Sequence, residues 1–214
     1  MPGRPPPPGF AYAQPMAPPV PTVDQLVDMF SLEPLPVEGG VARQTWRSHR
    51  HWPGNDKPAG TAIVMLLDRG ADSFSALHRL PTDEVWHFYL GDPVELLELH
   101  PDGRSERVVL GHDVLAGQRV QHVVAAQTWM GAHLLPGGGD AGWALFGTTM
   151  APGFTAEDYE GGTAAELAAA YPAEADLIAR LTRASAPTTM PLTPAVGDGA
   201  LDLRGQPDPG RSTK

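Results

Sequence analysis

The feature that most constrains the fold is a series of short apolar runs between residues 40 and 152, each ended by glycine, proline or aspartate. Many runs of about 4–8 residues with regular turn signals between them are typical of all-β sandwiches and barrels. The pattern therefore predicts an all-β domain. The predicted strands are Ala42–Arg47, Gly60–Leu67, Asp72–Arg79, Glu84–Leu90, Val94–His100, Arg104–Leu110, Gln118–Val124, Ala132–Leu135 and Gly142–Thr149.

Two segments beside the predicted strands have helical spacing instead. Residues 22–30 place Leu26, Val27 and Phe30 on one helical face, and Thr22 can cap the helix. The alanine-rich segment at residues 166–181 is broken by Pro172, which predicts two short helices on the outside of the barrel.

Both ends of the chain have the composition of disordered tails. Residues 1–21 contain nine prolines, four of them consecutive, and residues 184–214 are rich in proline, glycine, aspartate, serine and threonine. Such segments lack the apolar pattern that a packed core needs. We therefore expect one domain over residues 22–183, flanked by a disordered tail at each end. The N-terminal tail could also be a proline-rich ligand for a partner domain.

Composition excludes several classes of protein. The formal charge of −10, without a basic cluster, argues against nucleic acid or an anionic membrane surface as a partner. The chain has no cysteine, which excludes disulfides, thiolate metal sites and a cysteine nucleophile. No secretion signal or membrane-length apolar stretch is present, so we expect a cytoplasmic protein.

The most informative block is residues 77–91, LHRLPTDEVWHFYLG. Alternation along the second strand places Glu84, Trp86 and Phe88 on one face. Because the two aromatic side chains are large and apolar, that face should be the barrel interior. Glu84 is then buried near the barrel mouth, where His78 of the adjoining strand can approach it across the ladder.

This block resembles the first sequence motif of the cupin superfamily. His78, Glu84 and Gly91 match the motif's first histidine, its glutamate and its final glycine, whereas Leu80 replaces the second histidine and Asp72 the leading glycine. The segment at residues 117–130 resembles the second motif less closely. There, Ala125-Ala126-Gln127 replaces the Pro-x-Gly turn, and Met130 replaces the histidine.

Across residues 24–183 the chain resembles the cupin family known as DUF985 or cupin 5. The resemblance implies a jelly-roll β-barrel, a homodimer and an architecture like that of sugar-nucleotide epimerases, with no settled reaction. The matching pieces are Glu38-Gly39-Gly40, Arg43 with Thr45, Arg47-Ser48, Thr61-Ala62-Ile63, His78-Arg79-Leu80, Asp83 through Tyr89, Gly91-Asp92-Pro93, Leu110-Gly111, Gln121, Trp129 and Ala151-Pro152-Gly153-Phe154.

His78 and Glu84 are the candidate catalytic residues. Burial raises a carboxyl pKa while a neighbouring imidazole opposes the rise, so the pair could transfer protons near neutral pH. This favours metal-independent acid–base chemistry of an isomerase, epimerase, cyclase or lyase type on a polar small molecule. One alternative is a divalent transition metal on His78, Glu84 and an unexpected third ligand. Others are a structural hydrogen bond between the two side chains, and a binding module without chemistry.

The remaining candidates would bind substrate. Arg43 and Arg47 are predicted on one face of a strand, where they could clamp a carboxylate or phosphate if that face is interior, or lie at the surface if it is not. Gln44 and Gln127 replace residues usual in the family and so could contact the ligand. The same role is open to Trp86, Phe88, Trp129 and Met130, although the three aromatic residues also fit a barrel core.

Overall fold

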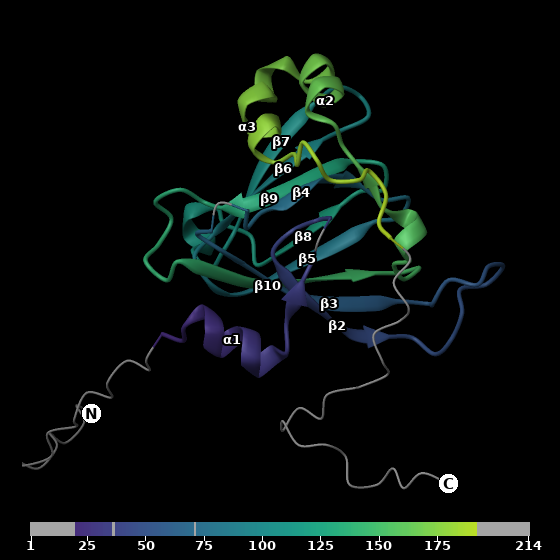
Figure 1. Cartoon of the computed structure of the whole chain (residues 1–214), viewed down its shortest axis with the longest axis horizontal. Coiled ribbons are helices and arrows are strands. Elements are labelled where there is room, and N and C mark those ends of the chain that lie inside the picture. The colour runs from purple at the N-terminus through teal and green to yellow at the C-terminus, as the bar shows by residue number, and fades with distance from the viewer. Residues whose placement is uncertain (1–19, 36, 71, 192–214) are drawn as a thin grey trace, which may run out of the picture.

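The computed structural model describes residues 20–35, 37–70 and 72–191. Within these ranges the chain forms two antiparallel sheets, of six and five strands, with short helices on their outer sides (Figure 1). The predicted all-β class with one N-terminal helix and two C-terminal helices is confirmed.

The six-stranded sheet has the spatial order β1 (Glu33–Pro34), β2 (Val41–Arg47), β3 (Thr61–Asp68), β10 (Trp143–Met150), β5 (Glu84–Gly91) and β8 (Gln121–Val124). The five-stranded sheet has the order β11 (Glu160–Gly161), β4 (Ser75–Arg79), β9 (Trp129–Leu134), β6 (Val94–Leu99) and β7 (Ser105–Leu110). The helices are α1 (Val23–Phe30), α2 (Ala164–Ala170) and α3 (Ala175–Arg180), and single 3₁₀ turns span Val114–Ala116, Ala156–Asp158 and Pro172–Glu174.

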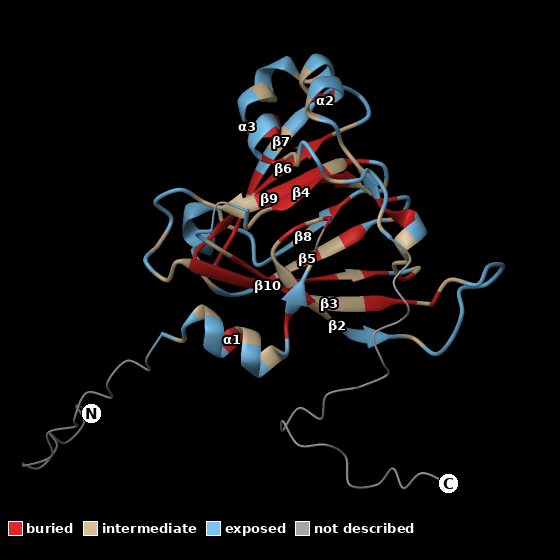
Figure 2. Cartoon of the chain, viewed as in Figure 1, coloured by how far each residue is buried: buried red, intermediate tan, exposed pale blue. Residues whose placement is uncertain are grey.

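The main core lies between the two sheets. Alternate residues of the strands point inward, so that Trp86 and Phe146 of one sheet pack in the same cluster as Leu96 and Met130 of the other. Figure 2 shows the buried residues concentrated in these strands. The polar side chains described below share this inner face.

Helices cover parts of both outer faces, which is why several strands are apolar on both sides. Leu97 and Leu99 of β6 pack under α2 and α3, whereas Leu66 of β3 packs against Leu26 of α1. In Figure 1, α1 and the α2–α3 pair accordingly lie on opposite sides of the molecule. Thr22 caps α1 as predicted, with its hydroxyl accepting the backbone N–H of Gln25 at 3.2 Å.

Gly91 ends β5 in a conformation that its motif position requires. Its φ is +95°, and a Cβ added there would lie 2.2 Å from the carbonyl oxygen of Trp143. Glycine alone combines this dihedral with so close a backbone approach. The glycine that follows Glu84 in the first motif therefore serves a turn between strands.

Most of the two predicted tails lies outside the described residues. In the described part of the C-terminal segment, the carbonyl of Thr188 accepts the backbone N–H of Gly161 at 2.7 Å. No helix within the described ranges is long and apolar enough to cross a membrane.

Candidate functional site

His78 faces the barrel interior from β4 and is only 2% exposed. Its Nδ1 lies 2.8 Å from the carbonyl oxygen of Ala76. Because a carbonyl oxygen only accepts hydrogen bonds, Nδ1 carries the proton and Nε2 remains available as a base. The imidazole also stacks on the ring of Tyr159, with centroids 5.0 Å apart, which fixes its orientation.

Glu84 opens β5 and points to the same interior, where it is 7% exposed. The indole N–H of Trp86 donates to its Oε2 at 3.0 Å, and the hydroxyl of Thr148 also hydrogen-bonds the carboxylate. Burial raises the pKa of this carboxyl to about 7, although His78 opposes the rise. The carboxyl can therefore both donate and accept a proton at neutral pH.

His78 and Glu84 interact electrostatically, but by a different route from the predicted one. We expected neighbouring strands, but β4 belongs to the five-stranded sheet and β5 to the six-stranded sheet. Their electrostatic interaction therefore crosses the interior rather than running along a ladder. The turn between β4 and β5 takes the chain from one sheet to the other. The sequence pattern of the two strands does not show this crossing.

Two residues of this site were not predicted as site residues from the sequence. Glu38 accepts a hydrogen bond from the buried hydroxyl of Ser75 at 2.9 Å, and its charge further raises the pKa of Glu84. Tyr159, which stacks on His78, has a raised phenol pKa, chiefly because it is buried. Glu38 precedes β2 and Tyr159 precedes β11, so no strand periodicity could have placed either one.

A second histidine–glutamate pair faces the same interior. Glu98 of β6 is 2% exposed, and its Oε1 hydrogen-bonds Nε2 of His122 on β8. The other carboxylate oxygen lies 3.9 Å from Nε2 of His100. Glu98 and His100 were missed because β6 is apolar on both faces, which conceals its alternation. His122 turns inward through plain alternation, opposite Trp86.

The predicted interior residues lie where they were expected. Trp86 and Phe88 belong to the barrel core, and Trp86 stacks on Phe146 with centroids 5.2 Å apart. Met130 of β9 is buried between His78 and Glu98, which are its register partners on the two neighbouring strands. These three residues therefore adjoin the polar groups, as walls of the interior.

The prediction that Arg43 and Arg47 share one face of the strand is wrong. A register shift after Gln44 makes Arg43 pair with Val64, which packs toward α1, whereas Arg47 pairs with Thr61 of the inner face. The extra residue reverses the alternation, so Arg43 and Arg47 lie on opposite faces of β2. Gln44 pairs with Ile63 on the inner face but is itself exposed.

Two further candidates occupy positions that the sequence did not indicate. Trp129 lies on the outer face of β9, where the guanidinium of Arg79 stacks over it at 4.7 Å. Gln127 is exposed in the preceding turn with φ +66°, the left-handed conformation that a glycine of the family's turn would adopt easily. Trp129 therefore packs under the C-terminal helices, and Gln127 shapes the turn.

The donor set does not fit a catalytic metal. Leu80 and Met130 occupy positions where cupin metal sites carry histidines, and the carboxylate of Glu84 is already bonded to Trp86 and Thr148. Within the described ranges, no group of three histidine, cysteine, aspartate or glutamate side chains could hold an ion.

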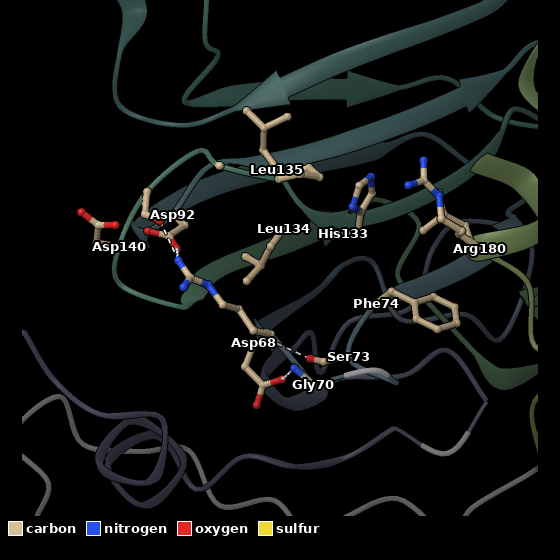
Figure 3. A pocket seen from close by; sticks show the side chains of 15 residues that line it. Asp68, Gly70, Ser73, Phe74, Asp92, His133, Leu134, Leu135, Asp140 and Arg180 are labelled. Atoms are coloured by element: carbon tan, nitrogen blue, oxygen red, sulfur yellow. Dashed lines mark hydrogen bonds and ion pairs between the residues drawn. The ribbon is translucent and has the colours of Figure 1, made fainter. Parts of the chain in front are cut away.

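A cavity of about 670 Å³ lies at the other end of the barrel (Figure 3). It is lined by Phe74 just before β4, His133 and Leu134 at the end of β9, Asp92 between β5 and β6, and Arg180 of α3. His78 and Met130 lie at the opposite ends of β4 and β9. This cavity is therefore separate from the histidine–glutamate pairs.

Comparisons with known proteins agree with this architecture. The structure is similar to a crystal structure from Shewanella oneidensis, with 30% identity, a TM-score of 0.68 and coverage of 76% of this chain and 98% of that one. A hypothetical protein from Leishmania major gives 30% identity, a TM-score of 0.68 and coverage of 76% and 99%. Curated proteins give no match. The family model described as "Cupin superfamily (DUF985)" matches residues 24–161, and the chain therefore belongs to this cupin family.

Proposed function

We propose that this cupin is an enzyme that performs metal-independent acid–base chemistry on a polar small molecule. The reaction would be an isomerisation, epimerisation, cyclisation or elimination that begins with removal of a proton next to a carbonyl group. Such a reaction needs one group that accepts a proton and another that donates one, both held in the same buried site.

The observation that carries the proposal is that His78 lies close enough to Glu84 to oppose the burial-induced rise in the pKa of its carboxyl. Nδ1 of His78 is engaged by the carbonyl of Ala76, so Nε2 would act as the base. The Glu84 carboxyl, with a pKa of about 7, would return a proton to the substrate. A general acid or base is most effective when its pKa lies near the working pH.

Tyr159 and Trp86 support this assignment as positioning residues. Tyr159 stacks on the imidazole of His78, and Trp86 donates to the carboxylate of Glu84. Both reacting groups are therefore held by side chains that are themselves buried, which limits the geometries they sample.

Solvent exchange tests the proposal without knowledge of the final product. The untagged protein would be incubated in D₂O with a panel of aldoses, ketoses and α-hydroxy ketones, and deuterium next to the carbonyl would be followed by mass spectrometry. We expect exchange of at least one compound, reduced at least about 100-fold in both His78→Asn and Glu84→Gln.

The matched control is a histidine–glutamate pair on the outer face of the same sheet. His133 and Glu95 are linked by a 3.0 Å hydrogen bond, and His133→Asn and Glu95→Gln should exchange at the wild-type rate. Equal exchange in all four variants would overturn the acid–base role. Tight binding of a compound that never exchanges would instead indicate a binding module.

The homodimer and the cytoplasmic location implied by the sequence remain proposals. Native mass spectrometry with elemental analysis of the untagged protein would measure subunit number and metal content together. One equivalent of transition metal whose removal abolishes exchange would replace the proposed mechanism.

A further inference from the structure

Glu98 is a buried carboxylate on a strand whose other inward-facing residues, Val94 and Leu96, are apolar. It alternates with Leu96 on the inner face of β6 and is 2% exposed. Its register partner on β9 is Met130, whose partner on β4 is His78. Two steps between paired residues of an antiparallel sheet place the Cα atoms of Glu98 and His78 roughly 10 Å apart on one face.

The hydrogen bonds of His122 define how Glu98 is held. A guanidinium nitrogen of Arg119 donates to Nδ1 of His122 at 2.8 Å. Because arginine only donates, Nδ1 is the acceptor, and the ring proton of neutral His122 resides on Nε2. Nε2 therefore donates to Oε1 of Glu98. One carboxylate oxygen is thus fixed by a side chain that is anchored at the protein surface.

The second carboxylate oxygen of Glu98, Oε2, faces His100 without a direct hydrogen bond. Nε2 of His100 is buried and has no hydrogen-bond partner among the described residues, and it lies 3.9 Å from Oε2 of Glu98. That distance is too long for a direct hydrogen bond. Buried polar atoms are nearly always paired, so this nitrogen and the nearby carboxylate oxygen form a site that a third polar group can bridge.

A hydroxyl group has the chemistry that completes this arrangement. It can donate its proton to Oε2 of Glu98 while its oxygen accepts a hydrogen bond from Nε2–H of His100. We propose that Glu98 and His100 form a subsite that binds a ligand hydroxyl, and that the ligand is a polyhydroxylated compound of about monosaccharide size. This inference rests on the proposed function, because it places the reacting carbon at His78 and Glu84 and a hydroxyl at the far end.

Titration of free sugars tests the subsite directly. D-glucose, D-galactose, D-mannose and D-fructose would be titrated into the full-length protein by calorimetry. We expect at least one to bind, and Glu98→Gln and His100→Ala to weaken that binding at least about tenfold, the usual cost of a lost hydrogen bond to a charged group. Glu95→Gln, on the outer face of the same strand, should bind like the wild type.

A second measurement avoids any effect of the substitutions on folding. The ring resonances of His100 in the wild-type protein should shift when the sugar saturates, whereas those of His133 should not. The proposal would be overturned if no sugar bound. It would also be overturned if both variants bound sugar like the wild type and the His100 resonances did not shift, because Oε2 of Glu98 and Nε2 of His100 would then contact only water.

The two proposals fail in distinguishable ways. If His78→Asn abolishes deuterium exchange while Glu98→Gln leaves sugar binding intact, the acid–base function stands and the subsite is wrong. If sugar binding depends on Glu98 while exchange ignores His78, the subsite stands and the proposed chemistry is wrong.

Discussion

The imidazole of His78 and the phenol of Tyr159 stack at an interplanar angle of 18°, with both rings buried. Tyr159→Phe keeps this contact and should change the free energy of unfolding by less than about 1 kcal/mol. Tyr159→Ala removes a buried ring and should lower it by about 3 kcal/mol. Urea unfolding of both variants measures the difference.

Catalysis provides an independent readout of the same stacking. If Tyr159 positions His78, Tyr159→Phe should retain deuterium exchange and Tyr159→Ala should lose most of it at temperatures where it is still folded. Loss of exchange in Tyr159→Phe would show that the phenol hydroxyl itself takes part.

The inward-facing residues His78 and His122 should hold opposite tautomers in their neutral forms. His78 donates from Nδ1 to a carbonyl, whereas His122 accepts at Nδ1 from Arg119. Long-range ¹H–¹⁵N correlation spectra at high pH should therefore show a protonated Nδ1 in His78 and a protonated Nε2 in His122. The same tautomer in both rings would contradict the hydrogen-bond network described above.

The buried carboxyl of Glu84 should make stability depend on pH. Its pKa rises on folding from 4.5 to about 7, so between these values the folded protein retains a proton that the unfolded chain has released. The free energy of unfolding should therefore fall as the pH rises through this range, by up to about 3 kcal/mol in total.

Glu84→Gln, which carries no titrating group, should lack this dependence. Wild type and variant should differ by about 3 kcal/mol more at pH 8 than at pH 4, in favour of the variant. Chemical denaturation of both proteins at several pH values would check this. If the free energies of unfolding of the two proteins changed equally with pH, the pKa of Glu84 would not be raised by folding.

Gln127 stores strain in the turn before β9. A non-glycine residue with φ +66° destabilises the folded state by about 1–2 kcal/mol. Glycine removes this strain, but it also gives the unfolded chain more conformational freedom, which offsets part of the gain. Gln127→Gly should therefore raise the free energy of unfolding by about 0.5–1 kcal/mol. Ala126→Gly, one residue earlier and without a positive φ, should lower it.

The fold was predictable from the sequence because most of the long strands are bounded by glycine, proline or aspartate. Gly91, which closes β5 at a positive φ, shows how directly such a residue fixes a strand boundary. The faces of β2 were less predictable, since a register shift after Gln44 leaves no compositional mark. Such a shift depends on how neighbouring strands pair, which a single sequence does not display.

The candidate site was predictable only where a motif or clean alternation marked it. His78 and Glu84 belong to a motif and alternate with aromatic residues. Glu98 lies between Leu97 and Leu99, which are buried under the C-terminal helices rather than in the barrel, so both faces of β6 look apolar. The role of Tyr159 depends on the path of the chain after the last long strand.

Each of the two interior pairs, His78 with Glu84 and His122 with Glu98, spans the two sheets, and together they draw on β4, β5, β6 and β8. No hairpin or single sheet contains a complete pair, so neither pair can form before the barrel closes. Opening the barrel would in turn separate both pairs at once. Ligand binding at this interior should therefore slow the hydrogen exchange of amides that open only in global unfolding. Amides that exchange through local fraying should keep the same exchange rate.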